Sequence, residues 1–207
     1  MSTDTQAPRK WRVATVSLAG CFGCHMSFLD IDERLLELVE HVEFDRSPLT
    51  DIKTVGHCDI GLVEGGLCNA ENVEVLRHFR EHCDVLVSVG DCATTGGIPA
   101  LRNMVPLVEC LEEAYLKGPS VHNPEGRIPD DPEIPLLLDR VCPAHEVVRI
   151  DGYLPGCPPS ADTLWAALDA LLAALVRPHP VVGEHAVEVE DDEANRGELR
   201  HSRAATG

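Results

Sequence analysis

Four cysteines in short, glycine-flanked turns carry the strongest chemical signal in the sequence. Cys21 and Cys24 form a CxxC pair, and Cys92 and Cys157 lie far downstream; we call these four residues the cysteine quartet. Thiolates bind soft metals and exchange electrons, and neighbouring glycines let backbone N–H groups approach the sulfur atoms. A CxxC pair where a helix begins also lies at the positive end of the helix dipole, which favours the thiolate over the thiol. The quartet is therefore a candidate ligand set for one metal centre.

Each of these turns follows an apolar run that predicts a buried strand. The predicted strands are 11–18, 59–63, 83–89 and 146–151, and residues 43–46 are compatible with a short edge strand. Helices are predicted at 25–42, after an Asn69 cap, at 107–116, and after a Ser160 cap. This alternation of strands and helices predicts a three-layer α/β domain with a parallel sheet.

The predicted fold explains how distant cysteines could meet. In parallel α/β sheets, ligands bind beyond the carboxyl ends of the strands. Every member of the quartet lies just after a predicted strand, and so does Glu64. We therefore expect the quartet and Glu64 to gather at one edge of the sheet.

The spacing favours a [4Fe–4S] cluster and leaves two alternatives open. A zinc-stabilised interaction module would also use four thiolates, although zinc sites usually combine paired short spacings. A thioredoxin-like dithiol oxidoreductase would need only Cys21 and Cys24. The remaining cysteines are expected to be small buried hydrophobic residues: Cys58, Cys68, Cys83, Cys110 and Cys142. Among the histidines, His25 is the one expected to form a hydrogen bond beside the ligands.

Composition narrows the class of protein. The chain has 207 residues, a net charge of −18 and only 4% aromatic residues, which argues against a nucleic-acid-binding surface. No apolar run is long enough to span a membrane, and residues 1–10 lack the apolar segment of a secretory signal. Nine cysteines without such a signal indicate a reducing, cytoplasmic location.

The chain is predicted to divide into three parts. Residues 1–10 form a flexible N-terminus, residues 11–177 form the α/β domain, and residues 178–207 form a polar, acidic C-terminal tail. Five prolines and two glycines in 117–135 exclude regular structure there, so this loop and the tail are candidate partner surfaces.

Four motifs in their order along the chain resemble the small subunit of [NiFe] hydrogenases. They are Gly20-Cys21-Phe22-Gly23-Cys24, Val63-Glu64-Gly65-Gly66, Gly90-Asp91-Cys92 with Gly96-Gly97, and Gly156-Cys157-Pro158-Pro159. The similarity runs from about Val13 to Leu175 and is greatest to the short form in soluble, NAD-reducing (bidirectional) hydrogenases. Two further segments, 29–36 and 49–53, also look like that subgroup.

The resemblance implies a flavodoxin-like fold and one [4Fe–4S] cluster, bound by Cys21, Cys24, Cys92 and Cys157. It implies that the Ni–Fe centre lies in a separate large subunit, and that FMN and NAD bind to iron–sulfur and flavin (diaphorase) subunits. The chain would then relay electrons in an H2:NAD+ oxidoreductase. Glu64 would have either a proton-transfer or a structural role beside the cluster, with no catalytic residue in this chain.

Two departures from related proteins refine this expectation. Larger hydrogenase small subunits carry two further clusters in a C-terminal domain, but this chain lacks those cysteines, so one cluster is expected. A related subunit of respiratory complex I has adjacent cysteines at the first motif, whereas this chain has CxxC, which favours a hydrogenase. The acidic tail after Arg177 matches no part of these relatives.

Overall fold

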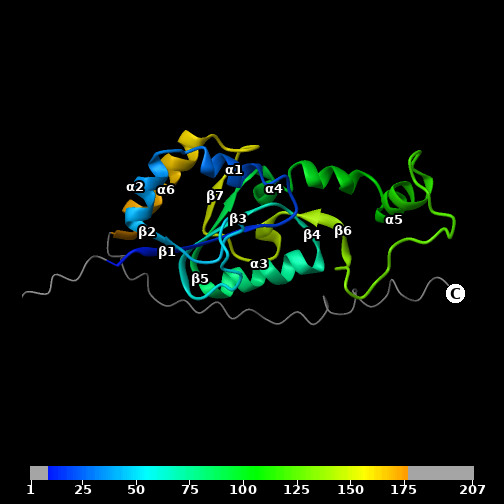
Figure 1. Cartoon of the computed structure of the whole chain (residues 1–207), viewed down its shortest axis with the longest axis horizontal. Coiled ribbons are helices and arrows are strands. Elements are labelled where there is room, and N and C mark those ends of the chain that lie inside the picture. The colour runs from blue at the N-terminus through cyan, green and yellow to red at the C-terminus, as the bar shows by residue number, and fades with distance from the viewer. Residues whose placement is uncertain (1–8, 177–207) are drawn as a thin grey trace, which may run out of the picture. The chain divides into compact units, whose positions relative to one another are not determined.

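The domain is built on a five-stranded parallel sheet (Figure 1), which a computed structural model describes within residues 9–176. The strands are β1 (Trp11–Ser17), β2 (Val42–Phe44), β3 (Cys58–Glu64), β5 (Cys83–Val89) and β7 (Gly152–Leu154). Their order in the sheet is β2-β1-β3-β5-β7, and every pairing is parallel. Within this sheet the order corresponds to 2-1-3-4-5, the flavodoxin-like arrangement. The predicted fold class is confirmed.

Helices cover both faces of the sheet. They are α1 (Gly23–Leu29), α2 (Arg34–His41), α3 (Ala70–His82), α4 (Gly90–Thr95), α5 (Leu107–Glu112) and α6 (Ala161–Val176). Figure 1 shows α1, α2 and α6 on one face and α3 on the other. Short 3-10 helices follow at Ile98–Met104 (η1) and Ala144–Glu146 (η3), and a π-helical turn at Glu113–Lys117 (η2) extends α5.

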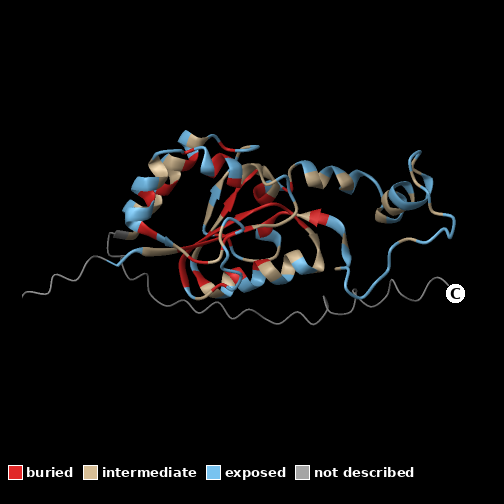
Figure 2. Cartoon of the chain, viewed as in Figure 1, coloured by how far each residue is buried: buried red, intermediate tan, exposed pale blue. Residues whose placement is uncertain are grey.

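The central strand β3 forms the middle of the core, and all seven of its residues are buried. Figure 2 shows that buried residues follow the sheet, whereas the outer sides of α2 and α3 are exposed. Helix α3 closes one face with Leu76 and Phe79, neither of which is exposed to solvent. Its first turn is capped as predicted, because the side-chain oxygen of Asn69 accepts a hydrogen bond of 2.8 Å from the backbone N–H of Asn72.

The helix predicted at 25–42 is two helices, and this part of the prediction was wrong. Helix α1 ends at Leu29, and α2 begins at Arg34 after a turn in which Asp32 has a left-handed φ of 60°. Aspartate tolerates that conformation better than most residues. The apolar spacing continues across the turn, so Phe28 and Ile31 are still buried. Periodicity alone could not reveal the break.

The last strand and two further strands differ from the prediction. Residues 146–151 do not form a strand; β7 begins at Gly152, and Ile150 packs into the core without strand pairing. A separate two-stranded antiparallel sheet joins β4 (Leu67–Asn69) to β6 (Leu137–Cys142), which the sequence analysis did not predict. Strands β4 and β7 have three residues each, too few to show an alternating pattern, and the six residues of β6 (LLDRVC) do not alternate between apolar and polar.

The chain divides into two units, residues 1–171 and residues 172–207. Only 172–176 of the second unit is described, as the end of α6. The acidic tail at 178–207 and most of the segment 1–10 lie outside the described residues, so these boundaries stay predictions. Within residues 9–176, no helix combines the length and the apolar character needed to cross a membrane.

Leu76→Ala tests the packing of α3. Removing this fully buried side chain should lower the free energy of unfolding by about 2–5 kcal/mol, because it leaves a cavity under the helix. Leu36→Ala on α2 is the control, since Leu36 is 72% exposed and its loss should cost less than about 0.5 kcal/mol. Urea denaturation of the anaerobically purified variants measures both values, and equal losses would contradict this account of the core.

Candidate metal centre

The parallel register aligns the ends of four strands in a row. Ser17 pairs with Glu64 across β1 and β3, and Glu64 pairs with Val89 across β3 and β5. Val89 in turn pairs with Leu154 across β5 and β7. Each turn that carries a quartet cysteine begins within a few residues of this row. The fold therefore delivers all four cysteines to one edge of the sheet, as the sequence predicts.

Electrostatic interactions link the four thiols into one group, and Glu64 acts on Cys24 and Cys92. The charges of Glu64, Cys92 and Cys21 all act on Cys24, and Glu64 is also within hydrogen-bonding reach of the Cys24 thiol. The charges of Cys157, Cys21 and Glu64 act on Cys92. Cys21 and Cys157 are exposed, whereas Cys24 and Cys92 are partly buried, so the group opens to solvent on one side.

Without a bound cation, this grouping disfavours thiolates. Burial, followed by the nearby Glu64 and the other cysteines, raises the pKa of Cys24 from 9.0 to about 12. Burial and the charges of Cys157 and Cys21 also raise the pKa of Cys92. The expectation that the helix N-terminus favours the Cys24 thiolate is therefore wrong for the metal-free chain, because burial and like charges dominate. A strongly positive group would reverse that balance.

Backbone and side-chain hydrogen bonds tie the ligand turns to one another. The turn after β1 and the turn after β3 are joined in both directions, from Ala19 N–H to the Gly66 carbonyl (3.0 Å) and from Gly66 N–H to the Ala19 carbonyl (2.7 Å). The hydroxyl of Ser27 on α1 donates to the carbonyl of Pro159, in the turn that carries Cys157. These contacts connect the CxxC pair to both neighbouring turns.

Asp91 joins the other two ligand turns. Its backbone N–H donates to the Gly156 carbonyl (2.8 Å), and its carboxylate accepts from the Gly156 N–H (2.7 Å). These two bonds hold the residue before Cys92 against the residue before Cys157. The sequence analysis quoted Asp91 only as part of a motif and assigned it no role.

Glycines leave room for the sulfur atoms. A side-chain carbon at Gly90 would lie 2.3 Å from Cys24 Sγ, and Gly90 has a φ of +81°, a conformation that few other residues adopt. Carbons at Gly97 and Gly23 would lie 3.0 Å from Cys92 Sγ and 3.1 Å from Cys21 Sγ. The nearby backbone N–H of Ile98 lowers the pKa of the Cys92 thiol, against the larger effect of burial.

A buried polar chain leads away from the quartet through Glu64 and His25. The Glu64 carboxylate accepts from the backbone N–H of His25 at 3.1 Å, and its Oε1 lies 3.0 Å from His25 Nδ1 without aligned hydrogen-bond geometry. His25 Nε2 lies 2.9 Å from Thr15 Oγ1, which lies 2.7 Å from Ser47 Oγ. All four of these residues are buried. The expectation that His25 bonds beside the ligands agrees with this arrangement.

The charge of Glu64 is stabilised within this chain. Burial alone raises the pKa of its carboxyl, but bonds from His25 and Ser17 and the charge of His25 outweigh burial, so the pKa lies below its ordinary value. Glu64 therefore stands as a carboxylate against the Cys24 thiol. The sequence analysis did not single out Thr15 or Ser47. Thr15 lies within the first strand, before the CxxC motif, and Ser47 lies in an irregular loop.

The other cysteines lie apart from the quartet. Cys58 and Cys83 are buried in the core, as predicted, and burial raises the pKa of each thiol. Cys68, Cys110 and Cys142 are only partly buried, so the expectation of full burial does not hold for them. Cys68, which follows Glu64 by four residues, lies on β4 near Arg102.

Comparison with known proteins identifies the family to which the chain is similar. Residues 21–171 match the profile of the family described as NADH ubiquinone oxidoreductase, 20 Kd subunit. The delta subunit of the NAD-reducing hydrogenase HoxS of Cupriavidus necator is 51% identical over 165 residues, which cover 79% of each chain. A crystal structure of an NAD+-reducing [NiFe]-hydrogenase in the H2-reduced state has 56% identity and a TM-score of 0.78, covering 86% of this chain and 99% of that chain.

More distant relatives are longer. One subunit of the F420-non-reducing hydrogenase of Methanothermobacter thermautotrophicus is 40% identical over 166 residues, which cover 79% of this chain. The match spans only 54% of that relative, so the chain corresponds to about half its length.

Gly90→Ala tests the close approach of the backbone to Cys24. The added carbon would collide with Cys24 Sγ and displace this ligand. We therefore expect the metal affinity to fall at least about tenfold, which is the loss typical of changes to residues that orient metal ligands. Gly126→Ala is the matched control, because Gly126 also has a positive φ (+62°) but has nothing within 4 Å of the added carbon. It should cost about 1–2 kcal/mol of strain and keep the metal. Elemental analysis would contradict the account if both variants lost metal equally.

Asp91→Ala tests the tie between the last two ligand turns. Loss of the bond to Gly156 N–H should weaken metal retention about 10–100-fold, because two ligands are no longer held together. Asp91→Asn keeps an accepting oxygen and should retain most of the metal. Asp84→Ala, at the other end of β5, is the control, and metal release during chelator challenge is the measurement. Equal release from Asp91→Ala and the wild type would exclude this role.

Proposed function

The chain belongs to the family described as NADH ubiquinone oxidoreductase, 20 Kd subunit, and we propose that it is the electron-transfer small subunit of an NAD-reducing [NiFe] hydrogenase. One observation carries the proposal: four cysteine turns, spread over most of the chain, meet at one edge of the sheet. The match to the delta subunit of an NAD-reducing hydrogenase, over most of both chains, supports the choice of enzyme.

The cysteine quartet binds one [4Fe–4S] cluster, with Cys21, Cys24, Cys92 and Cys157 as its ligands. The donor set fits, because such clusters are held by four cysteine thiolates. The raised pKa values of Cys24 and Cys92 also fit, since these thiols need a positive partner to ionise at neutral pH. When bound, the cluster supplies a centre that accepts and donates single electrons.

The arrangement of the cysteines supports a cluster over a single zinc ion. Zinc sites usually combine paired short spacings, whereas here one CxxC pair is joined by two cysteines from separate, distant turns. In a cluster, each of the four thiolates binds a different iron atom.

The protein residues hold the ligands and adjust their charge. The Ile98 N–H lies where it stabilises negative charge on the Cys92 sulfur, and N–H groups beside cluster ligands influence the reduction potential. Glu64 is a positioning residue, which keeps a carboxylate against Cys24 and is itself held by His25. Its buried chain to Thr15 and Ser47 suits a role in hydrogen bonding or proton movement beside the cluster.

The enzyme is an H2:NAD+ oxidoreductase whose Ni–Fe centre lies in a large subunit, not in this chain. The exposed side of the quartet, at Cys21 and Cys157, is where a partner can approach the cluster. Electrons pass from the large subunit through this chain to iron–sulfur and flavin (diaphorase) subunits that hold FMN and NAD. The complex works in the cytoplasm, where a reducing environment keeps the thiols free.

A thioredoxin-like dithiol oxidoreductase explains less of the structure. It would use Cys21 and Cys24 and leave unexplained why Cys92 and Cys157 stand beside them. Burial and the charge of Glu64 also raise the pKa of Cys24, whereas a reactive dithiol needs a thiolate.

Cys92→Ser and Cys157→Ser test the ligand assignment. Each should lose most of about four irons and four sulfides per chain, the EPR signal of the reduced cluster, and H2-dependent NAD+ reduction by the complex. Cys110→Ser should keep all three, because Cys110 lies apart on α5. Iron and acid-labile sulfide analysis after anaerobic purification decides the matter. Full iron and sulfide in Cys157→Ser would refute the assignment, and zinc without sulfide in the wild type would refute the cluster.

A further inference from the structure

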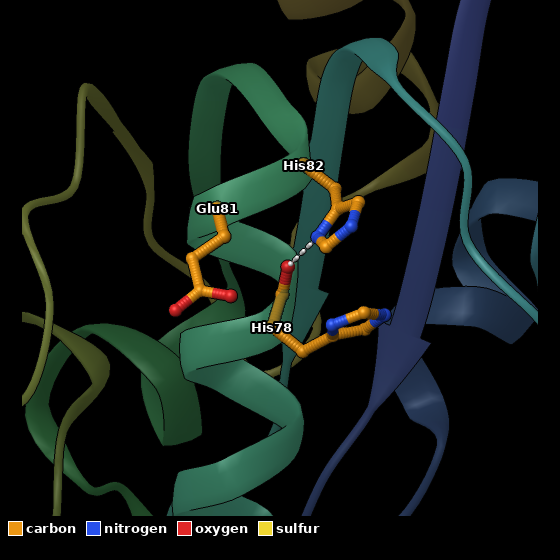
Figure 3. A group of neighbouring side chains, drawn as sticks. All are labelled: His78, Glu81 and His82. Atoms are coloured by element: carbon orange, nitrogen blue, oxygen red, sulfur yellow. Dashed lines mark hydrogen bonds between the residues drawn. The ribbon is translucent and has the colours of Figure 1, made fainter.

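Helix α3 carries a second group of metal-binding side chains, at the end of the sheet away from the quartet. His78, Glu81 and His82 each offer one ligand atom, and these atoms all lie within 4.8 Å of one another. Figure 3 shows both imidazoles on one side of the helix, one above the other, and the Glu81 side chain on the other side of the ribbon in this view. We propose that this group is a binding site for a divalent transition-metal ion such as Zn2+, Ni2+ or Cu2+.

The helix presets the distance between the two histidines. Residues four apart are neighbours on a helix surface, and the two rings have their centroids 4.1 Å apart with a tilt of 49°. Glu81 adds a carboxylate from the same turn. All three side chains are exposed or only partly buried, so they can rotate to close the remaining distance around one ion.

One hydrogen bond prepares His82 as a ligand. Its Nδ1 lies 2.8 Å from the backbone carbonyl oxygen of His78, as the dashed line in Figure 3 shows. A carbonyl only accepts, so Nδ1 is the nitrogen that carries the proton, and Nε2 keeps its lone pair. Metal-binding histidines commonly donate their other N–H to such a carbonyl, which fixes the ring and its tautomer.

The surroundings of the group favour a cation. The group lies in the last turn of α3, where the helix dipole is negative, and the whole chain has a net charge of −18. Arg80, the cation inside this stretch, is already bound to Asp151 at 2.6 Å and to the backbone carbonyl of Asp84 at 3.0 Å. Within the described residues, neither Arg80 nor Arg77, which lies one turn before Glu81, forms an ion pair with Glu81, so this carboxylate is available.

The supporting helix is rigid, which lowers the cost of binding. Helix α3 has 13 residues, is capped by Asn69, and is anchored by the buried Leu76 and Phe79. Two imidazole nitrogens and one carboxylate suit borderline divalent ions, whereas Mg2+ and Ca2+ prefer all-oxygen sites. The bound ion would link residues 78 and 82 and so stabilise the turn that leads directly into β5.

This site and the quartet lie at opposite ends of β5. Helix α3 ends at His82, β5 begins at Cys83, and Cys92 follows the other end of the strand. Seven residues of strand span about 20 Å, so metal bound to α3 would not contact the ligand turns. The proposal is therefore independent of the function assigned to the quartet, and its failure would leave that function untouched.

Equilibrium dialysis of the full chain against ZnCl2, with its cluster intact and under anaerobic conditions, tests the site. The wild type should bind one Zn2+ more than the double variant His78→Gln/His82→Gln, and His82→Gln alone should weaken that binding at least about tenfold. The control His41→Gln/His122→Gln removes two exposed histidines outside the group and should bind as the wild type does. Cu2+ should compete more strongly than Ni2+, and Mg2+ should not compete.

Amide hydrogen exchange provides a second measurement, which distinguishes zinc bound at this site from zinc bound elsewhere on the surface. Zn2+ should slow amide exchange at residues 79–83 in the wild type and in the control, but not in the double variant. Equal Zn2+ uptake by the wild type and the double variant would overturn the proposal, and so would wild-type exchange that zinc does not change. If circular dichroism shows that the double variant folds poorly, Glu81→Gln replaces it. The proposal would then be overturned if Glu81→Gln and His82→Gln both kept the wild-type zinc affinity and the wild-type slowing of amide exchange.

Discussion

The parallel register of β1, β3, β5 and β7 is the constraint on which the rest of the structure depends. It places Ser17, Glu64, Val89 and Leu154 side by side, so the turns that follow begin from one edge. A one-residue slip would move every side chain of β3 to the opposite face of the sheet, and the close packing on both faces of this fully buried strand does not allow that exchange. Core packing therefore determines where the cysteines meet, although none of them lies in the core.

Bringing four cysteines and a carboxylate together disfavours the thiolate forms in the absence of a cation. Bonds that do not involve the sulfurs hold the turns in place, namely the paired backbone bonds of Ala19 and Gly66 and the two bonds between Asp91 and Gly156. Interactions with His25 lower the pKa of the Glu64 carboxyl and so favour its charged form. The ligand turns are thus organised before any metal arrives, which is typical of sites that must keep a fixed geometry.

The two ends of the sheet differ in their chemistry. The carboxyl edge gathers thiols and glycine turns, which suit iron and sulfur, whereas the end of α3 presents imidazoles and a carboxylate, which suit borderline divalent ions. Both follow from the same topology, because a helix that connects parallel strands starts at one edge and ends at the other. The −18 charge of the chain favours cations and basic partner surfaces in general, and local ligand geometry selects among them.

The sequence alone determined the features that depend on neighbouring residues. The strand over 83–89, the Asn69 cap, the parallel α/β class and the meeting of the quartet were all readable, because apolar runs, caps and glycine turns act over a few positions. Only the tertiary structure decided the break at Asp32, the three-residue β7 and the β4–β6 sheet, since short elements are stabilised by packing and not by their own pattern. The tertiary structure also decided the hydrogen bonds of Asp91 and Thr15, because these bonds join residues that are far apart in the chain. It likewise decided the raised pKa of Cys24, which depends on burial that no local motif encodes.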